Sequence, residues 1–196
     1  MTCRVYLIRH GEPKLEEKRT LYGATDLPLS KKGRKSAKAL SDVIGRISPD
    51  LVVSSPMIRC LDTAEEAGFK PLEVPDLREI DLGEWEMKKF SDLARECPED
   101  LDKRWTEIET FRPPKGESFE DLAKRTVPAI REKLTDRRSL AVFGHLGVFR
   151  TILWKEIGIP LKTVFSMEQD YCGIHVLDYG SKGVKLVRSN WSPQIT

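Results

Sequence analysis

Long hydrophobic runs, clustered cysteines and an excess of one charge are all missing from this chain of 196 residues. Internal repeats and low-complexity tracts are absent as well. No apolar stretch approaches the roughly 20 residues that a membrane-spanning helix needs, so we expect no membrane partner. The 33 basic and 31 acidic side chains leave a net charge of +2, without a long basic stripe. Nucleic acid is therefore also an unexpected partner, because binding to it depends on clustered positive charge.

The few cysteines are too scattered to form a recognisable site. They stand at widely separated positions without a C-x-x-C pair: Cys3, Cys60, Cys97 and Cys172. Such spacing favours reduced thiols over a disulfide framework or a zinc site. The first residues, Met1 to Arg4, lack the apolar segment that a secretory signal shows before charge appears. No cluster of His, Asp and Glu has the spacing of a metal site either. We therefore expect a cytoplasmic protein that needs no metal or other cofactor.

Short apolar segments alternate with amphipathic ones along the chain. The expected strands are residues 5–8, 51–53, 72–74 and 140–143, followed by a hairpin formed by residues 173–178 and 184–188. Strands alternating with helices predict an α/β fold, a three-layer sandwich in which helices flank a mostly parallel central sheet. The length suits a single domain, residues 1–196. Residues 76–116 are the least periodic part, and we expect them to form a lid-like insertion with one or two helices that caps the active site.

Capping residues suggest where the helices begin. Ser30 is expected to cap the first helix, and Pro56 to occupy the first position of the second. Ser118 and Asp121 have the S-x-x-D form of a capping box. Pro128 is expected to kink the helix that follows or to divide it in two.

Two of the expected strands end in histidine. His10 follows the first strand and His145 the fourth, and Arg9 stands beside the first histidine. Arg59 lies in the first turn of the helix after residues 51–53, so it can face the same edge of the sheet. The carboxyl ends of parallel strands meet at one rim, which is where such folds bind ligands. Two guanidinium groups and two imidazoles converging there predict a pocket for phosphate oxygens.

The segment LIRHGE, residues 7–12, resembles the signature of the histidine phosphatase, or phosphoglycerate mutase-like, superfamily. Four further segments resemble the motifs that follow it in that family, in the same order: residues 22–33, 54–64, 77–86 and 144–147. Together the five motifs span residues 5–150. Within the superfamily, residues 21–26 and 114–119 are most similar to the α-ribazole phosphatase branch of cobalamin synthesis.

The resemblance implies a catalytic mechanism. His10 would attack phosphorus and form a phosphohistidine, for which it must be neutral, and nearby Arg9 and Arg59 would lower its pKa toward that state. Arg9, Arg59 and His145 would hold the equatorial oxygens of the phosphoryl group. Tyr22, in the loop after the signature, would contribute to substrate binding, as would the adjacent Gly23.

The resemblance also implies a general acid. Glu79, at the matching position of the motif in residues 77–86, would protonate the leaving alkoxide and then activate water. Three nearby carboxylates are rivals for that role: Asp81, Glu84 and Glu86.

The sequence departs from the family pattern at three positions and contains one further histidine. Glu16 stands near the place where mutase-type members have an asparagine, which puts direct phosphate contact there in doubt. Met87 replaces a glycine that many relatives have, so the backbone there is expected to differ. Leu146 stands where a second small residue is common. His175, between two apolar residues of a probable strand, is expected to have a structural role.

These observations predict a phosphomonoester hydrolase acting on a small phosphorylated metabolite, with α-ribazole 5′-phosphate as a candidate. Two alternatives remain open at this point. One is a phosphoglycerate mutase, although its relatives usually have a longer insertion. The other is a phosphoprotein-directed regulatory phosphatase or a phosphate-binding module. Binding alone would give Glu79 no role. The protein is expected to be a monomer or a homodimer.

Overall fold

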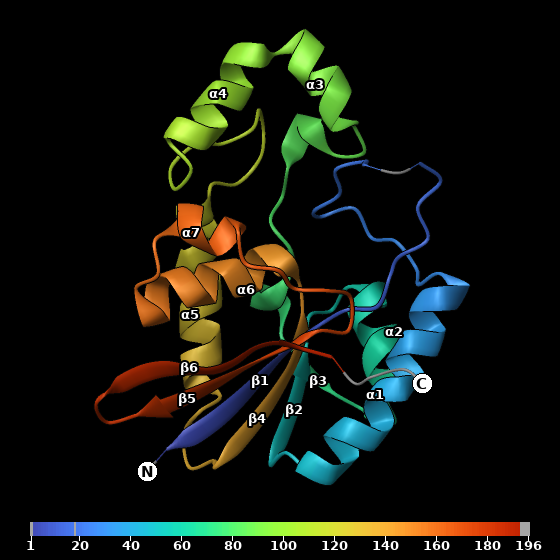
Figure 1. Cartoon of the computed structure of the whole chain (residues 1–196), viewed down its shortest axis with the longest axis vertical. Coiled ribbons are helices and arrows are strands. Elements are labelled where there is room, and N and C mark those ends of the chain that lie inside the picture. The colour runs from blue at the N-terminus through green and yellow to red at the C-terminus, as the bar shows by residue number, and fades with distance from the viewer. Residues whose placement is uncertain (1, 18, 193–196) are drawn as a thin grey trace.

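A computed structural model describes residues 2–17 and 19–192 of the chain. A six-stranded sheet with the order β3-β2-β4-β1-β5-β6 forms its centre (Figure 1). The strands have the following bounds: β1 Cys3–Arg9, β2 Leu51–Ser54, β3 Leu72–Glu73, β4 Ser139–Gly144, β5 Ile174–Gly180 and β6 Gly183–Trp191. The pairings among β1, β4, β2 and β3 are parallel, whereas β5 and β6 add an antiparallel hairpin at one edge. The predicted strands and the hairpin are confirmed.

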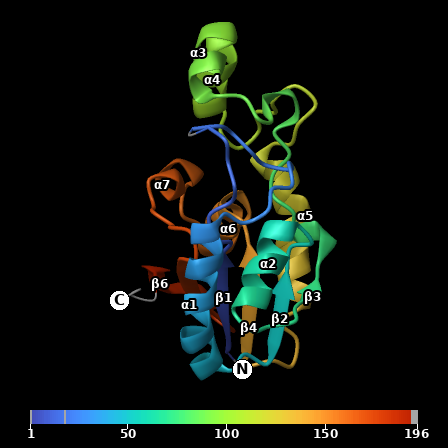
Figure 2. The same ribbon diagram turned by 90° about the vertical axis from the view of Figure 1, so that its right-hand side faces the viewer.

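Helices cover both faces of this sheet. On one side lie α1 (Lys31–Ile47) and α2 (Ile58–Glu66), which Figure 2 views from outside. On the other side, α5 (Phe119–Glu132) packs against α6 (Leu146–Ile152). The alternating side chains of the strands join two separate apolar clusters, because successive residues of a strand face opposite sides. The predicted three-layer α/β sandwich is therefore confirmed.

The two central strands end at the same rim. β1 and β4 pair in parallel, with Arg9 opposite Gly144, so that His10 and His145 leave neighbouring strands side by side. The buried character of β1 follows from its apolar run, in which Val5, Leu7 and Ile8 have no exposed surface.

Two helix starts follow the sequence pattern. Ser30 caps α1 by accepting a hydrogen bond from the Gly33 N–H, and Ser118 with Asp121 forms the complete capping box of α5. Pro128 lies within α5 without dividing it.

The start of the second helix was predicted wrongly. Pro56 does not begin α2, which starts at Ile58 after Met57. The cap comes instead from a distant loop, because the Asp26 carboxylate accepts the Ile58 N–H at 3.0 and 3.1 Å.

The region after β4 is helical as far as Gly158, as the helical pattern of residues 148–157 predicts. α6 begins at Leu146, and its continuation η3 (Leu153–Ile157) is a π-helix that ends at Gly158 with φ of +82°. A further short helix, α7 (Leu161–Phe165), had no counterpart among the expected elements.

Residues 76–116 form an extension beyond the rim of the sheet. It begins with the 3₁₀ turns η1 (Pro75–Leu77) and η2 (Gly83–Trp85). Two α-helices follow, α3 (Phe90–Glu96) and α4 (Pro98–Thr106), and Figure 1 shows them at the far end of the molecule from the hairpin. The expectation of one or two helices is confirmed. Within residues 2–17 and 19–192, no helix combines the length and apolar character needed to cross a membrane.

Candidate active site

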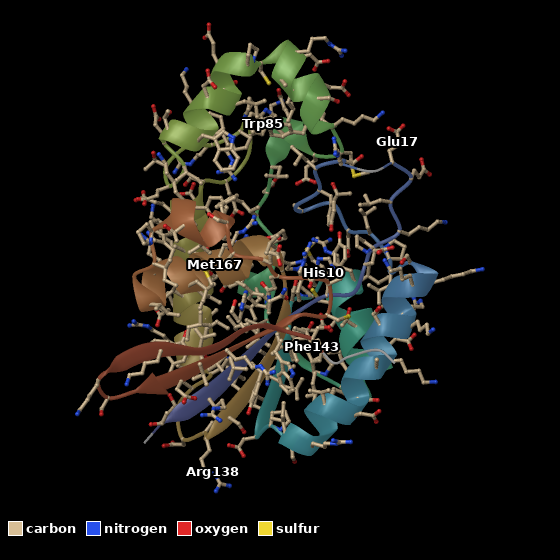
Figure 3. All side chains as sticks on the ribbon, in the orientation of Figure 1. His10, Glu17, Trp85, Arg138, Phe143 and Met167 are labelled. Atoms are coloured by element: carbon tan, nitrogen blue, oxygen red, sulfur yellow. The ribbon has the colours of Figure 1, made fainter. Side chains whose placement is uncertain are left out.

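The two histidines predicted to meet at the rim of the sheet do so. The ring centroids of His10 and His145 are 5.3 Å apart, with an angle of 60° between the planes. Both are buried, with 2% and 0% of their surface exposed. Figure 3 shows His10 between the sheet and the extension formed by residues 76–116.

The hydrogen bond of His10 determines which ring nitrogen is free. Its Nδ1 lies 2.7 Å from the carbonyl oxygen of Gly11, which can only accept a hydrogen bond. Nδ1 must therefore carry the proton, and Nε2 of the neutral ring carries a lone pair. Burial lowers the pKa of His10 well below its ordinary value, and the charges of Arg59 and Arg9 add to the effect. The expected effect of the two arginines is present, although burial contributes more.

His145 has the opposite tautomer. Arg59 Nε donates to its Nδ1 at 3.3 Å, so Nε2 bears the proton and donates to the Ser55 hydroxyl at 2.8 Å. Burial, followed by the charge of Arg59, lowers the pKa of His145 well below its ordinary value. This imidazole is therefore neutral and held from both sides.

Arg59 is completely buried and organises the loop that follows β1. Besides its bond to His145, its two terminal nitrogens donate to the carbonyl oxygens of Thr25 and Gly23, each at 2.8 Å. Gly23 also uses its N–H, which donates to Glu86. In this structure Gly23 is thus a support for Arg59, and its expected contact with substrate stays a prediction.

Arg9 lies on the other side of His10. Its Nη1 donates to the carbonyl oxygen of Gln169 at 2.6 Å, and its guanidinium stacks 4.1 Å from the centre of the Tyr171 ring. Its Nε is buried and has no hydrogen-bond partner among the described residues. Arg9 therefore retains an unsatisfied donor beside His10.

Two tyrosines border His10, and only Tyr22 is predicted from the sequence. The hydroxyl groups of Tyr22 and Tyr171 are 2.8 Å apart, and their rings lie 6.5 and 5.7 Å from His10. Burial, followed by Tyr171, raises the pKa of Tyr22, so the Tyr22 phenol stays neutral at pH 7. Tyr171 was missed because it stands in an irregular segment that carries none of the five motifs.

Glu79 is the carboxylate that the structure brings to this site. Only 9% of its surface is exposed. Its two oxygens accept backbone N–H groups, Oε1 from Ile80 at 2.9 Å and Oε2 from Gly147 at 3.0 Å. Gly147 leaves the necessary space, because a Cβ atom at that position would collide with Glu79 Oε1.

The nearest rival of Glu79 has a different role. The Glu86 carboxylate accepts hydrogen bonds from five groups: the backbone N–H of Gly23, Ala24, Thr25 and Leu82, and the Thr25 hydroxyl. Burial alone would raise the pKa of Glu86, but these bonds outweigh burial and lower it. Glu86 is thus an ionised anchor for the loop that Arg59 also holds.

The other two rivals have partners within the extension. Asp81 accepts the Gly83 N–H at 2.7 Å, and Glu84 forms a salt bridge with Lys115 in which both side chains are largely exposed. Neither lines the cleft that contains His10.

The three departures from the family pattern have simple structural outcomes. Glu16 is exposed and does not line the cleft. Met87 has φ of +61°, so its backbone keeps the left-handed conformation that a glycine would adopt, contrary to our expectation of a different backbone. Leu146 begins α6 and lines the cleft. His175 is buried in β5, where its Nδ1 accepts the Asn190 N–H at 3.2 Å, consistent with a structural role.

One cleft of about 290 Å³ contains His10, Glu79, Arg9 and the two tyrosines. It is lined by the following residues: Arg9, His10, Thr20, Leu21, Tyr22, Glu79, Ile80, Leu82, Arg104, Phe119, Leu146, Gly147, Arg150, Phe165 and Tyr171. In residues 2–17 and 19–192, no group of three or more His, Cys, Asp and Glu side chains is arranged to hold a metal ion.

Comparison with known proteins agrees with this arrangement. A model of the histidine phosphatase superfamily (branch 1) matches residues 5–192. The chain belongs to this superfamily. A curated relative, the 6-phosphofructo-2-kinase/fructose-2,6-bisphosphatase of Gallus gallus, is 36% identical over 151 residues, which cover 76% of this chain and 32% of the relative. The chain spans between 31% and 52% of the length of the first curated relatives that it matches.

Solved structures of histidine phosphatases match nearly the whole chain. A putative alpha-ribazole-5′-P phosphatase from Escherichia coli has a TM-score of 0.86 at 26% identity, covering 99% of this chain and 98% of that one. A mycobacterial glucosyl-3-phosphoglycerate phosphatase, in complex with VO3, has a TM-score of 0.85 at 26% identity, covering 97% and 100%. The structural neighbours of this chain thus include phosphatases, among them alpha-ribazole phosphatases.

Proposed function

We propose that this protein hydrolyses phosphomonoesters of small metabolites through a phosphohistidine on His10. The observation that carries the proposal is the tautomer of His10. Because Gly11 holds the proton on Nδ1, the lone pair of Nε2 is available for attack on phosphorus. The depressed pKa keeps the ring neutral at physiological pH, so no proton has to leave before the reaction.

In the first step, the bond between His10 Nε2 and phosphorus forms while the bond to the ester oxygen breaks. The positive charges of Arg9 and Arg59 beside His10 stabilise the charge spread over the phosphoryl oxygens. The unsatisfied Nε of Arg9 is a donor already placed there. Arg59 and His145 are buried in this structure, so their direct contact with the phosphoryl group is part of the proposal.

Glu79 is assigned to the proton transfers of both steps. As a carboxylic acid, it would give its proton to the departing alkoxide. As a carboxylate, it would then take a proton from the water whose oxygen attacks phosphorus, which breaks the nitrogen–phosphorus bond and restores His10. Its place in the cleft with His10, together with the structural roles of Asp81, Glu84 and Glu86, supports this assignment.

The cleft of about 290 Å³ suits a small molecule and not a folded phosphoprotein. α-Ribazole 5′-phosphate is a candidate substrate, supported by the similarity to alpha-ribazole phosphatases. We assign water as the phosphoryl acceptor, so that each alcohol released is accompanied by one inorganic phosphate.

The leaving-group dependence of a Glu79→Gln variant tests the proposal. An alkyl alkoxide needs a proton to depart, whereas nitrophenolate leaves as a stable anion. Rapid-mixing measurements of the first turnover, made with EDTA present, should therefore show a fall of about 100-fold to 10,000-fold for an alkyl phosphate. The fall should be much smaller for p-nitrophenyl phosphate.

The matched control is Glu84→Gln, which removes an exposed carboxylate from the same segment. It should leave both first-turnover rates unchanged. Equal slowing of both substrates by Glu79→Gln would show that Glu79 is not the acid. Transfer of phosphate to an added alcohol without release of inorganic phosphate would overturn the assignment of water as acceptor.

A further inference from the structure

The segment that carries Glu79 is neither a helix nor a strand. Glu79 stands in the irregular residues 78–82, between the 3₁₀ turns η1 and η2. It lines the cleft that contains His10, and it also lines a second cleft of about 300 Å³ together with Asp81. Because clefts border this irregular segment, packing alone holds it weakly. The partners of its backbone N–H and C=O groups therefore decide where Glu79 lies.

One guanidinium group binds three carbonyl oxygens of this part of the chain. Arg125, in α5, donates from Nη1 to the carbonyl oxygens of Asp76 and Arg78, both at 2.8 Å. Its Nη2 donates to the carbonyl oxygen of Glu79 at 3.0 Å. Nε and Nη2 also donate to the Glu117 carboxylate, at 2.9 and 2.8 Å. Each of the five N–H groups of this guanidinium thus has an acceptor.

Glu117 supports the same segment from the residue before the cap of α5. Its Oε2 accepts the Asp81 N–H at 3.0 Å, and its own N–H donates to the Asp81 carbonyl oxygen at 2.8 Å. Burial alone would raise the pKa of Glu117, but the bonds from Arg125 and Asp81 outweigh burial and lower it. The carboxylate is therefore ionised at pH 7 and forms a salt bridge with Arg125.

The backbone and the carboxylate of Glu79 are thus held by neighbouring helices. Arg125 of α5 binds its carbonyl oxygen, and the Gly147 N–H, at the start of α6, donates to its carboxylate. These two helices pack against each other. Because α6 follows directly on His145, which lies beside His10, the position of the acid relative to the nucleophile is fixed by this helix pair.

We propose that Arg125, held by Glu117, is a positioning residue for the general acid, which it keeps in the cleft of His10 without touching the substrate. This inference rests on the proposed function, because that function assigns the acid role to Glu79. Placement matters, since a displacement of about 1 Å can slow a reaction on the order of 100-fold. A lysine cannot replace Arg125, because it has three N–H donors and no planar fork.

Arg125→Lys tests this role, because it keeps the positive charge and loses two of the five donors. First-turnover rates should fall about 10-fold to 100-fold for an alkyl phosphate and much less for p-nitrophenyl phosphate, since only the alkoxide needs a proton to depart. Glu117→Gln, which removes the ionic partner of Arg125, should show the same dependence on the leaving group. Either variant suffices if the other does not fold. Equal slowing of both substrates would overturn the inference.

The matched control is Arg131→Lys, which makes the same exchange on the same helix. Arg131 is largely exposed and pairs with Glu156, so its replacement should change neither rate. A double variant completes the kinetic test. Added to Glu79→Gln, Arg125→Lys should slow the alkyl phosphate no further, because two residues that act as one are not additive. A further loss of the same size would show that Arg125 acts on something other than the acid.

The amide signal of Gly147 in NMR spectra separates this inference from the proposed chemistry. The Gly147 N–H donates to Glu79 Oε2, so its chemical shift reports where the carboxylate lies. Arg125→Lys should move the signal toward its position in Glu79→Ala, and Arg131→Lys should not. If the signal moves in this way, the positioning role stands even if no phosphohistidine forms. If Glu79→Gln shows the leaving-group dependence but Arg125→Lys changes neither the signal nor the rates, the positioning role is overturned and the hydrolase remains.

Discussion

At the residue scale, a carboxylate beside the catalytic groups can matter without touching the substrate. Glu86 accepts hydrogen bonds from four groups of the loop that also supplies the two carbonyl oxygens bound by Arg59. This loop contains Gly23 and Thr25, so Glu86 holds the short segment through its N–H groups and Arg59 through its carbonyl oxygens. Glu86 is therefore a positioning residue for the phosphate pocket.

Glu86→Gln should damage activity through that loop. The amide presents N–H groups to a ring of N–H donors, so at least one backbone group loses its partner. A lost buried bond to a charged group costs about 1.5–3 kcal/mol, and we expect a comparable loss in the free energy of unfolding. First-turnover rates should fall by the same factor for alkyl and p-nitrophenyl phosphates. Unchanged stability together with unchanged rates would contradict this role, whereas a leaving-group-dependent loss would make Glu86 an acid.

Single residues also show where sequence reasoning reaches its limit. His10, Arg9, Arg59, His145 and Glu79 were found because each follows a strand end or stands in a recognisable motif. Tyr171 was not, because its place beside His10 depends on how an irregular segment folds back over the rim.

At the scale of elements, the start of α6 and the acid are fitted to each other. The Gly147 N–H donates to Glu79, and the missing side chain of Gly147 leaves room for the carboxylate. The sequence shows a glycine two residues after His145, but it does not show that this glycine makes room for Glu79. It lies against a residue that is 68 positions away in the chain.

Gly147→Ala should therefore displace Glu79 and slow catalysis more than it lowers the stability of the fold. The added methyl group would push the Glu79 carboxylate away from its two N–H donors, and first-turnover rates on alkyl phosphates should fall at least 10-fold, by analogy with the loss of a general acid. The control is Gly45→Ala in α1, where a Cβ would meet no atom within 4 Å. That variant should be more stable by about 0.5–1 kcal/mol and fully active. Normal rates in Gly147→Ala would contradict the fit between Glu79 and α6.

The elements themselves were largely predictable, and the errors have physical causes. Buried strands and amphipathic helices are recognisable because their periodicity reflects which side faces the core. The prediction that Pro56 begins α2 was wrong because a helix can be capped by a distant side chain, here Asp26. Local sequence does not reveal such a cap. The short helix α7 carries too few residues for a periodic pattern to show.

At the scale of the whole molecule, all three histidines are buried and neutral. Burial is the first cause of the lowered pKa of His10 and His145, and the only one for His175, whose pKa is about 4. In the unfolded chain each would return to its ordinary value of 6.5. Below that pH the unfolded state binds more protons than the folded state, so stability falls as the pH falls.

Chemical denaturation at pH 7.5 and pH 5.5 measures this effect. Across that interval each buried histidine should reduce the free energy of unfolding by about 1.4 kcal/mol, or roughly 4 kcal/mol for the three. The stabilisation is complete above the unfolded pKa and is lost as the pH falls toward the folded one. His175→Gln should reduce the pH dependence by about a third while activity is kept. A stability that does not change between the two pH values would contradict the burial of neutral imidazoles.

The central claim is that phosphorus is transferred to Nε2 of His10, and rapid quenching followed by mass spectrometry tests it most directly. Wild-type protein mixed with substrate and stopped under alkaline conditions should carry acid-labile phosphate on the peptide that contains His10. The His10→Ala variant should carry none and should be inactive, while its unfolding temperature reports that it is folded. Phosphate on another residue, or wild-type turnover in His10→Ala, would contradict the mechanism.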